Sequence, residues 1–139
     1  MSEVSAADRL AAAGTDRSRA ANTILWVLQA LLALSFVTAG LQKLGGTEYM
    51  VNIFDKVGVG QWLRYVIGVL EIAGAVGALI PALSGLTALA LSLLMVGATV
   101  TNLFIGVTWA VPLGYLVLAV LVAWGRRSET KALAERFTR

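Results

Sequence analysis

The sequence predicts an all-α integral membrane protein, a four-transmembrane-helix bundle with both termini in the cytoplasm. Of its 139 residues, 58% are hydrophobic and 14% are charged, whereas a soluble domain carries about 25% charged residues. Residues 20–42 and 72–125 hold no charged residue, and a membrane span needs about 20 apolar residues in a helix. A soluble helical core is excluded, because none of these helices would have a polar outer face.

Residues 1–22 are predicted to form a cytoplasmic tail. Acidic and basic residues are mixed there, and the apolar stretch that follows is long enough to span a bilayer. The segment is therefore not a cleavable signal peptide. We expect this tail to be frayed and only partly helical.

The membrane domain is predicted to occupy residues 23–125. Its first uncharged stretch is long enough for one span. Pro81 with Gly85, and Gly106 with Pro112, mark tight turns that divide the rest of the domain. We expect four spans, near residues 23–43, 62–80, 85–106 and 109–125.

A single long loop, residues 44–61, separates the first two spans. Thr47 is a suitable N-cap for a short helix, and Gly58 and Gly60 are suitable residues to end it. The helix is amphipathic and is expected to lie on the outer membrane surface. The sequence leaves open whether it is a lid over the bundle or a connector, and we favour the connector. Its apolar face consists of Met50, Ile53, Phe54 and Val57.

Residues 126–139 are predicted to form a basic cytoplasmic tail. Within it, residues 128–139 can form a short helix with Leu133 and Phe137 on one face. Basic residues next to a membrane favour anionic lipid.

Basic residues predict the orientation of the chain, because they accumulate on the cytoplasmic side of a membrane. The first loop and its borders hold only Lys43, Lys56 and Arg64. An even number of spans also requires both tails to lie on one side, so we expect both termini in the cytoplasm of a bacterial or archaeal cell. The tails hold most of the basic residues: Arg9, Arg17, Arg19, Arg126, Arg127, Lys131, Arg136 and Arg139.

Tryptophan gives an independent indication of the same topology. Indole rings prefer the headgroup level of a bilayer. The expected spans put Trp26 and Trp124 at the inner interface, and Trp62 and Trp109 at the outer interface.

Glu71 is the one ionisable residue expected deep inside a span. An ionisable group at that depth costs about 2.5–3.5 kcal/mol and faces the bundle interior or a cavity. Helical side chains lean toward the N-terminus of their helix, so Glu71 leans outward and Lys43, at the outer end of the first span, leans into the membrane. We expect these two to form an ion pair, with Arg64 as the second candidate partner.

Other polar residues are expected near this pair, in the outer half of the bundle. Together they predict a polar pocket that opens to the outside and has Glu71 at its floor. Two interpretations remain open: a ligand or substrate site, and a structural polar network that fixes helix register. The candidate pocket residues are Gln42, Lys43, Arg64, Tyr65, Glu71, Thr99 and Asn102.

The chain contains no cysteine and no histidine. Disulfides, thiol redox chemistry, the usual zinc sites and His-ligated haem are therefore excluded. We expect no metal, no intrinsic cofactor and no nucleic-acid partner. A bound quinone or the cofactor of a partner protein would have to carry electrons.

Residues 39–44, AGLQKL, resemble the AGxxKL signature of the DoxX and DoxX-like membrane proteins. Residues 71–79, EIAGAVGAL, resemble the glutamate and spaced glycines of that family, and VGVG at residues 57–60 is in keeping with it. The resemblance covers about residues 23–125. It implies a four-helix bundle in a bacterial or archaeal plasma membrane, with Lys43 and Glu71 at motif positions.

The resemblance also implies a link to redox chemistry. The family is named after a subunit of an archaeal thiosulfate:quinone oxidoreductase, and other members are linked to redox homeostasis. Many relatives carry a histidine near the outer end of the third span, where this chain has Asn102. That departure removes a proton-transfer group.

Three functions are compatible with these features. The one we adopt is a membrane component of a quinone- or thiol-linked redox system, in which the pocket holds a quinone head or a small oxyanion, Lys43 is a donor and Glu71 is a proton acceptor. The second is a non-catalytic scaffold or assembly subunit. The third is a small proton-coupled transporter. The expected partners are the lipid bilayer, a redox enzyme subunit or a second copy of the chain.

Overall fold

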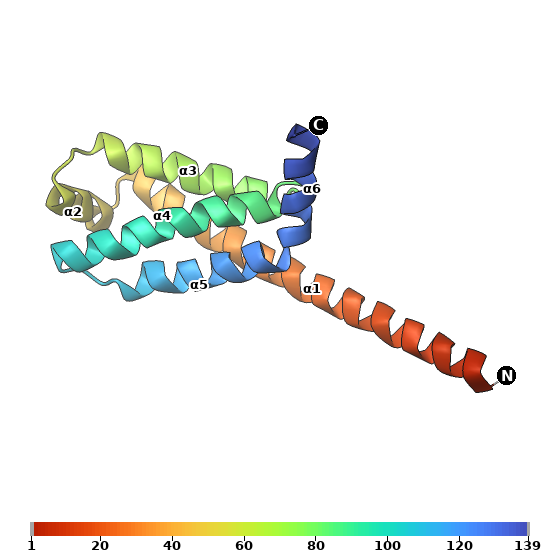
Figure 1. The fold of residues 1–139 in the computed structure, drawn as a ribbon. Coiled ribbons are helices and arrows are strands. Elements are labelled where there is room, and N and C mark those ends of the chain that lie inside the picture. Colours follow the sequence, from red (N-terminus) through yellow and green to blue (C-terminus); the bar gives the residue numbers. More distant parts are fainter. Residues whose placement is uncertain (1, 139) are drawn as a thin grey trace.

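The computed structural model describes the backbone of residues 2–138 and the side chains of residues 5–8 and 18–138. The regular secondary structure of this part of the chain is helical (Figure 1). The six helices, in order, are α1 (Ser2–Gly45), α2 (Glu48–Val57), α3 (Trp62–Ala78), α4 (Ser84–Ile105), α5 (Ala110–Gly125) and α6 (Arg127–Phe137).

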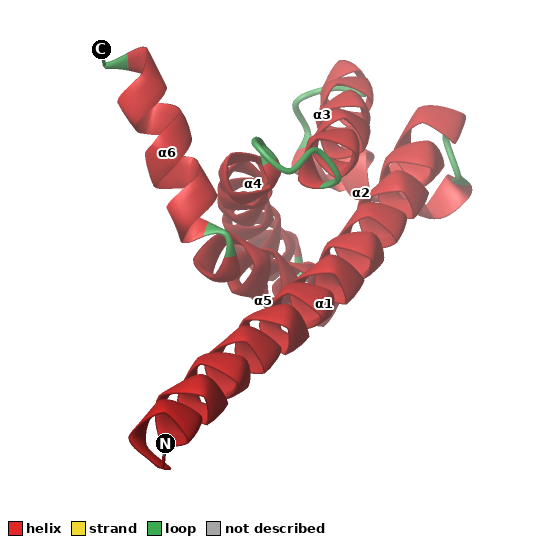
Figure 2. Ribbon diagram, turned by 90° about the vertical axis from the view of Figure 1, so that its right-hand side faces the viewer, coloured by secondary structure: helices red, strands yellow, loops and turns green. Residues whose placement is uncertain are grey.

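The frayed N-terminal tail predicted for residues 1–22 is wrong for the described residues. α1 is continuous from Ser2 to Gly45, and its N-terminal part projects away from the other helices (Figures 1 and 2). This segment is rich in alanine and contains no proline, so local preferences favour the helix. Its mixed charges do not interrupt it.

The other helices begin and end close to the predicted limits of the spans. α3, α4 and α5 match the ranges 62–80, 85–106 and 109–125 to within two residues. Gly106 ends α4, because it adopts a left-handed φ of 73° and its N–H binds the carbonyl of Asn102.

Two helical segments of the described residues are long and apolar enough to cross a membrane alone: Ser18–Gly45 of α1, and α4. α3 meets the same test together with α2, and α5 together with α6, although these pairs are bent by 117° and 65°. The described residues therefore contain two candidate spans, or up to four if each bent pair is one span. Large apolar side chains such as Leu93 and Phe104 are exposed on α4, as expected for a lipid-facing surface.

The helices of the bundle pack mainly as two pairs, α1 with α3 and α4 with α5. The pairs meet closely near α6, where small residues allow tight contact. A Cβ atom on Gly77 would collide with Thr87, and one on Gly125 would collide with Leu25. The buried apolar core includes Leu32, Phe36, Ala75, Ala78, Ala88, Leu91, Met95, Ala119 and Val122.

The four tryptophans fall into two groups at opposite ends of the bundle. Trp62 begins α3 and Trp109 precedes α5, at the end where α2 lies (Figure 1). Trp26 and Trp124 lie at the end where α6 begins. All four side chains are exposed.

Candidate functional site

Lys43 and Glu71 form the ion pair expected from the sequence. The Nζ atom of Lys43 donates a hydrogen bond to Oε1 of Glu71 at 3.1 Å and lies 3.0 Å from Oε2. Close packing of α1 on α3 brings Lys43 and Glu71 together. The packing is so close that a Cβ atom on Gly40 would collide with the carbonyl of Gly68. These glycines let the helix backbones approach one another next to the charged pair.

Glu71 is almost completely buried, with 1% of its side chain exposed, and Lys43 has 13% exposed. Oε2 of Glu71 has no hydrogen-bond partner among the described residues, although it lies close to the ammonium group. A carboxylate has several lone pairs, so Glu71 retains an acceptor position that Lys43 does not fill.

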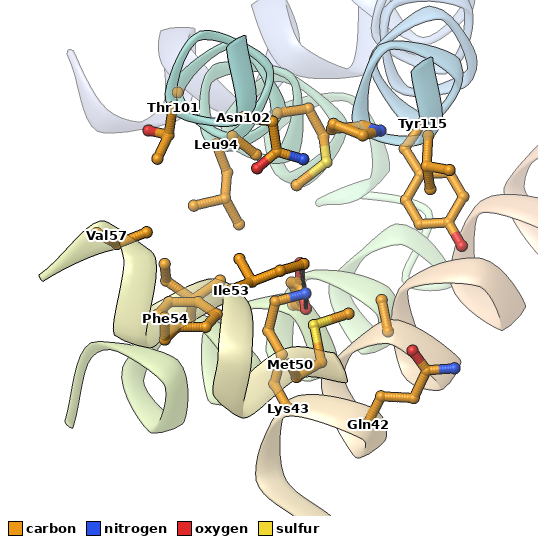
Figure 3. Close-up of a pocket in the computed structure, with 18 of the residues that line it drawn as sticks. Gln42, Lys43, Met50, Ile53, Phe54, Val57, Leu94, Thr101, Asn102 and Tyr115 are labelled. Carbon is orange, nitrogen blue, oxygen red and sulfur yellow. Dashed lines mark hydrogen bonds and ion pairs between the residues drawn. The ribbon is translucent and has the colours of Figure 1, made fainter. Parts of the chain in front are cut away.

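The ion pair lies on the wall of a cavity of about 390 Å³ (Figure 3). This volume lies in the range typical of small-molecule sites. α1, α3, α4 and α5 supply the walls, which consist mainly of apolar side chains. The polar side chains on the walls are Gln42, Lys43, Tyr49, Glu71, Thr101, Asn102, Thr108 and Tyr115.

α2 covers this cavity. Thr47 caps its start by accepting a hydrogen bond from the N–H of Met50, and Gly58 ends it with a left-handed φ of 79°. The apolar face expected from the sequence, which includes Ile53 and Phe54, lines the cavity (Figure 3). The interpretation of this segment as a simple connector is therefore wrong, because its apolar face is packed over the cavity and Phe54 is buried.

The other candidate residues divide between the cavity and its surroundings. Gln42 and Asn102 line it, and Nδ2 of Asn102 donates to the carbonyl of Thr108 at 2.8 Å. Thr99 donates within α4 to the carbonyl of Met95 at 2.7 Å and does not line the cavity. Tyr65 is exposed on the outside of α3. The cavity is consequently more apolar than the polar pocket that the sequence predicted.

Arg64 is buried but does not line the cavity. It donates to the carbonyl of Lys43 and, through Nε, to Oε1 of Gln61 at 2.7 Å. Gln61 in turn donates to the carbonyl of Val51 at 3.1 Å and to Asp55 at 2.8 Å. Arg64 thus joins the end of α1 to α2 and α3, and it contributes no charge to the cavity wall.

Several polar residues of the cavity wall were not predictable from the sequence. Thr101, Thr108 and Tyr115 line the same cavity as Asn102, and the ring of Tyr115 packs against Phe36 with centroids 5.4 Å apart. Threonine and tyrosine are ordinary in apolar helices. The position of Thr101 beside Asn102 is the one signal in the sequence that indicates this group.

A second buried polar cluster, absent from the sequence-based prediction, lies at the opposite end of the bundle. Nε of Arg126 donates to Oε1 of Gln29 at 2.7 Å, and Nη1 of Arg126 donates to Oδ1 of Asn22 at 2.9 Å. Gln29 is fully buried and donates to the carbonyl of Ala78 at 2.7 Å. The cluster therefore ties α1 to the end of α3 and to the junction of α5 and α6.

Glu129 adds a carboxylate to this second cluster, with Oε1 3.4 Å from Nη1 of Arg126. Partial burial raises the pKa of Glu129. Hydrogen bonds from its own backbone and from Ser128, together with the charge of Arg126, lower the pKa by more than burial raises it. The pKa therefore lies below its usual value. Glu129 is ionised at neutral pH and partly balances the charge of Arg126.

Comparison with known protein families gives a match to the model of the DoxX-like family over residues 27–124. The matched range runs from the middle of α1 to the last turn of α5 and includes every residue that lines the cavity. Comparisons with curated proteins and with solved structures found no match.

Proposed function

The chain belongs to the DoxX-like family, and from this membership and the geometry of the cavity we propose that it binds a quinone headgroup as a membrane component of a redox system. The observation that carries the proposal is the buried Lys43–Glu71 ion pair on the wall of a largely apolar cavity of about 390 Å³. The proposal specifies how the chain crosses the membrane, which ligand the cavity binds and which class of partner supplies the electrons.

The topology we propose has α1, α3, α4 and α5 each crossing a bacterial or archaeal plasma membrane once, with both termini in the cytoplasm. The excess of Lys and Arg in the two tails supports this orientation. The division of the exposed tryptophans between the two ends of the bundle supports four crossings. The cavity and α2 then lie in the extracytoplasmic half of the membrane.

The charge and the walls of the cavity favour a quinone over a small oxyanion. Lys43 and Glu71 balance one another, and the guanidinium group of Arg64 is bound elsewhere. A hydrophilic anion would lose its hydration there without meeting a net positive charge. A quinone has an apolar ring and two carbonyl acceptors, which suit apolar walls and an ammonium donor.

Each member of the ion pair has a role in this proposal. Lys43 donates a hydrogen bond to a quinone carbonyl, and Glu71 holds or accepts the proton exchanged at a quinone oxygen. The sequence contains no Cys or His, so the electrons come from the cofactor of a partner protein. A membrane-associated oxidoreductase is the partner class that fits.

Quinone binding by the purified chain in lipid nanodiscs tests the proposal. Gly97 lines the cavity, and a Cβ atom added there meets nothing within 4 Å. Gly97→Leu should therefore reduce the volume of the cavity without disturbing the helices, and we expect it to weaken binding of a short-chain ubiquinone or menaquinone analogue, measured by calorimetry.

Gly114→Leu is the matched control. Gly114 also has nothing within 4 Å of an added Cβ, but it does not line the cavity. We expect this variant to bind the analogue as the unmodified chain does. Equal binding by the two leucine variants would place the quinone elsewhere, and no binding by the unmodified chain would reject the proposal.

A scaffold without a ligand is the second candidate function. The hydrogen bonds from Arg64 to the carbonyl of Lys43 and from Arg126 to Gln29 favour it, because they connect neighbouring helices with no ligand involved. A scaffold predicts that Gly97→Leu leaves the co-purification of partner proteins and the activity of the assembly unchanged. Proton-gradient-dependent flux that disappears in Glu71→Gln would instead identify a transporter.

A further inference from the structure

α6 leaves the bundle at a sharp angle. It is bent by 65° from α5 and runs across the end of the bundle (Figure 1). Two exposed tryptophans lie beside its start: Arg126 is 5.6 Å from the ring of Trp26, and Arg127 is 4.4 Å from that of Trp124. Because indole rings prefer the headgroup level, α6 begins at the depth of a membrane surface.

One face of α6 is directed toward the bundle. Thr130, Leu133, Ala134 and Phe137 have the i, i+3, i+4, i+7 spacing of a single helical face. Thr130 fixes the direction of that face, because a Cβ atom on Gly85, at the start of α4, would collide with its hydroxyl group. The face therefore points along the bundle axis, toward the region that a membrane would fill.

Exposure increases along this face as α6 runs past the edge of the bundle. Thr130 and Leu133 are partly exposed, Ala134 is exposed, and Phe137 is 84% exposed. Phe137 lies on the same face of α6 as Thr130, which contacts the bundle, but Phe137 itself is exposed. It lies beyond the edge of the bundle, where lipid would begin. The apolar surface thus continues from protein into the surrounding bilayer.

The charges of α6 are arranged around this face. At 100° per residue, Lys131 and Arg136 flank it on its two sides, whereas Glu135 lies opposite. Glu129 is held by Arg126 and Ser128. The two flanking cations are thus left to face the headgroup layer, where anionic lipid attracts basic residues.

We propose that α6 is an interfacial helix that binds the surface of an anionic bilayer, with Leu133 and Phe137 among the acyl chains and Lys131 and Arg136 at the lipid phosphates. Apolar burial and charge attraction both contribute to such binding. The proposal does not depend on the ligand of the cavity, so either one can fail without the other.

Spin labels on single cysteines test the proposal, because the chain has no cysteine of its own. Ala134 lies on the apolar face, and Ala132 lies on the opposite side; both are exposed. Ala134→Cys and Ala132→Cys are therefore matched label positions in the full chain. The measurement is accessibility to oxygen and to a water-soluble nickel complex, in nanodiscs of phosphatidylcholine with phosphatidylglycerol.

We expect the label at position 134 to be accessible to oxygen and shielded from nickel, and the label at position 132 to be accessible to nickel. Equal nickel accessibility at both positions would overturn the interfacial helix. Lys131→Gln with Arg136→Gln should bring the label at position 134 closer to water. An unchanged depth in this variant, or in phosphatidylcholine alone, would overturn the preference for anionic lipid.

Discussion

Glu71 and Lys43 depend on one another at the level of single residues. Removing one partner of a buried ion pair leaves the other charge uncompensated and costs about 3–5 kcal/mol. We therefore expect Glu71→Gln to reduce the free energy of unfolding by about that amount, measured by denaturation of the purified chain in detergent.

Two further variants make this prediction specific. Lys43→Gln combined with Glu71→Gln removes both charges and should recover much of the lost stability. Glu48→Gln changes an exposed glutamate at the start of α2 and should have little effect. A Glu71→Gln variant as stable as the unmodified chain would contradict the prediction.

Gln29 is the second residue on which stability depends. It accepts from Arg126 and donates to the carbonyl of Ala78, and it is fully buried. Gln29→Leu leaves both of those groups without their partner, at a cost of about 1–3 kcal/mol for each unsatisfied group. We expect a lower unfolding midpoint than in Thr38→Val, which removes only an exposed bond within α1.

These two clusters differ in how far the sequence could predict them. The Lys43–Glu71 pair followed from the depth of one acid and the direction in which helical side chains lean. The Arg126 cluster did not, because Arg126 belongs to a run of tail charges that resembles a solvated segment. The turn after α5 buries it, and only the packing of α1 against α5 shows this.

At the level of elements, α2 is held over the cavity by hydrogen bonds from Gln61, and Arg64 in turn binds Gln61. Arg64→Lys keeps the charge but cannot bind the Lys43 carbonyl and Gln61 in the same fork geometry. We expect faster amide hydrogen exchange in residues 48–57 and unchanged exchange in α4. Arg127→Lys, which changes an exposed arginine, is the control, and unchanged exchange in α2 would show that Arg64 does not hold it.

The limits of most helices were predictable from the sequence. The length of α1 and the surface that α2 covers were not. Prolines, glycines and the absence of charge mark the ends of α3, α4 and α5 closely. The length of α1 is greater than its sequence predicts, because mixed charge is also typical of a frayed tail. The amphipathic pattern of α2 indicated which face is buried, but it contained no information on what that face covers.

The topology of the whole molecule can be tested with single introduced cysteines, because the chain has no cysteine of its own. We expect Ser5→Cys and Thr138→Cys to react with an impermeant maleimide only after spheroplasts are lysed, because basic tails are retained in the cytoplasm. Asn52→Cys, on the exposed side of α2, should react in intact spheroplasts. Reaction of position 138 before lysis would reverse the proposed orientation.

The length of α1 matters for the whole molecule. Its 44 residues correspond to a rod about 66 Å long, roughly twice the thickness of the hydrocarbon layer that it would cross. The same uninterrupted rod carries Lys43 near one tip and extends well past α6 at the other. In the topology that we propose, a partner protein that binds the N-terminal end of α1 lies in the cytoplasm. A rotation of the helix by that partner would then move the ammonium group of Lys43 in the opposite leaflet.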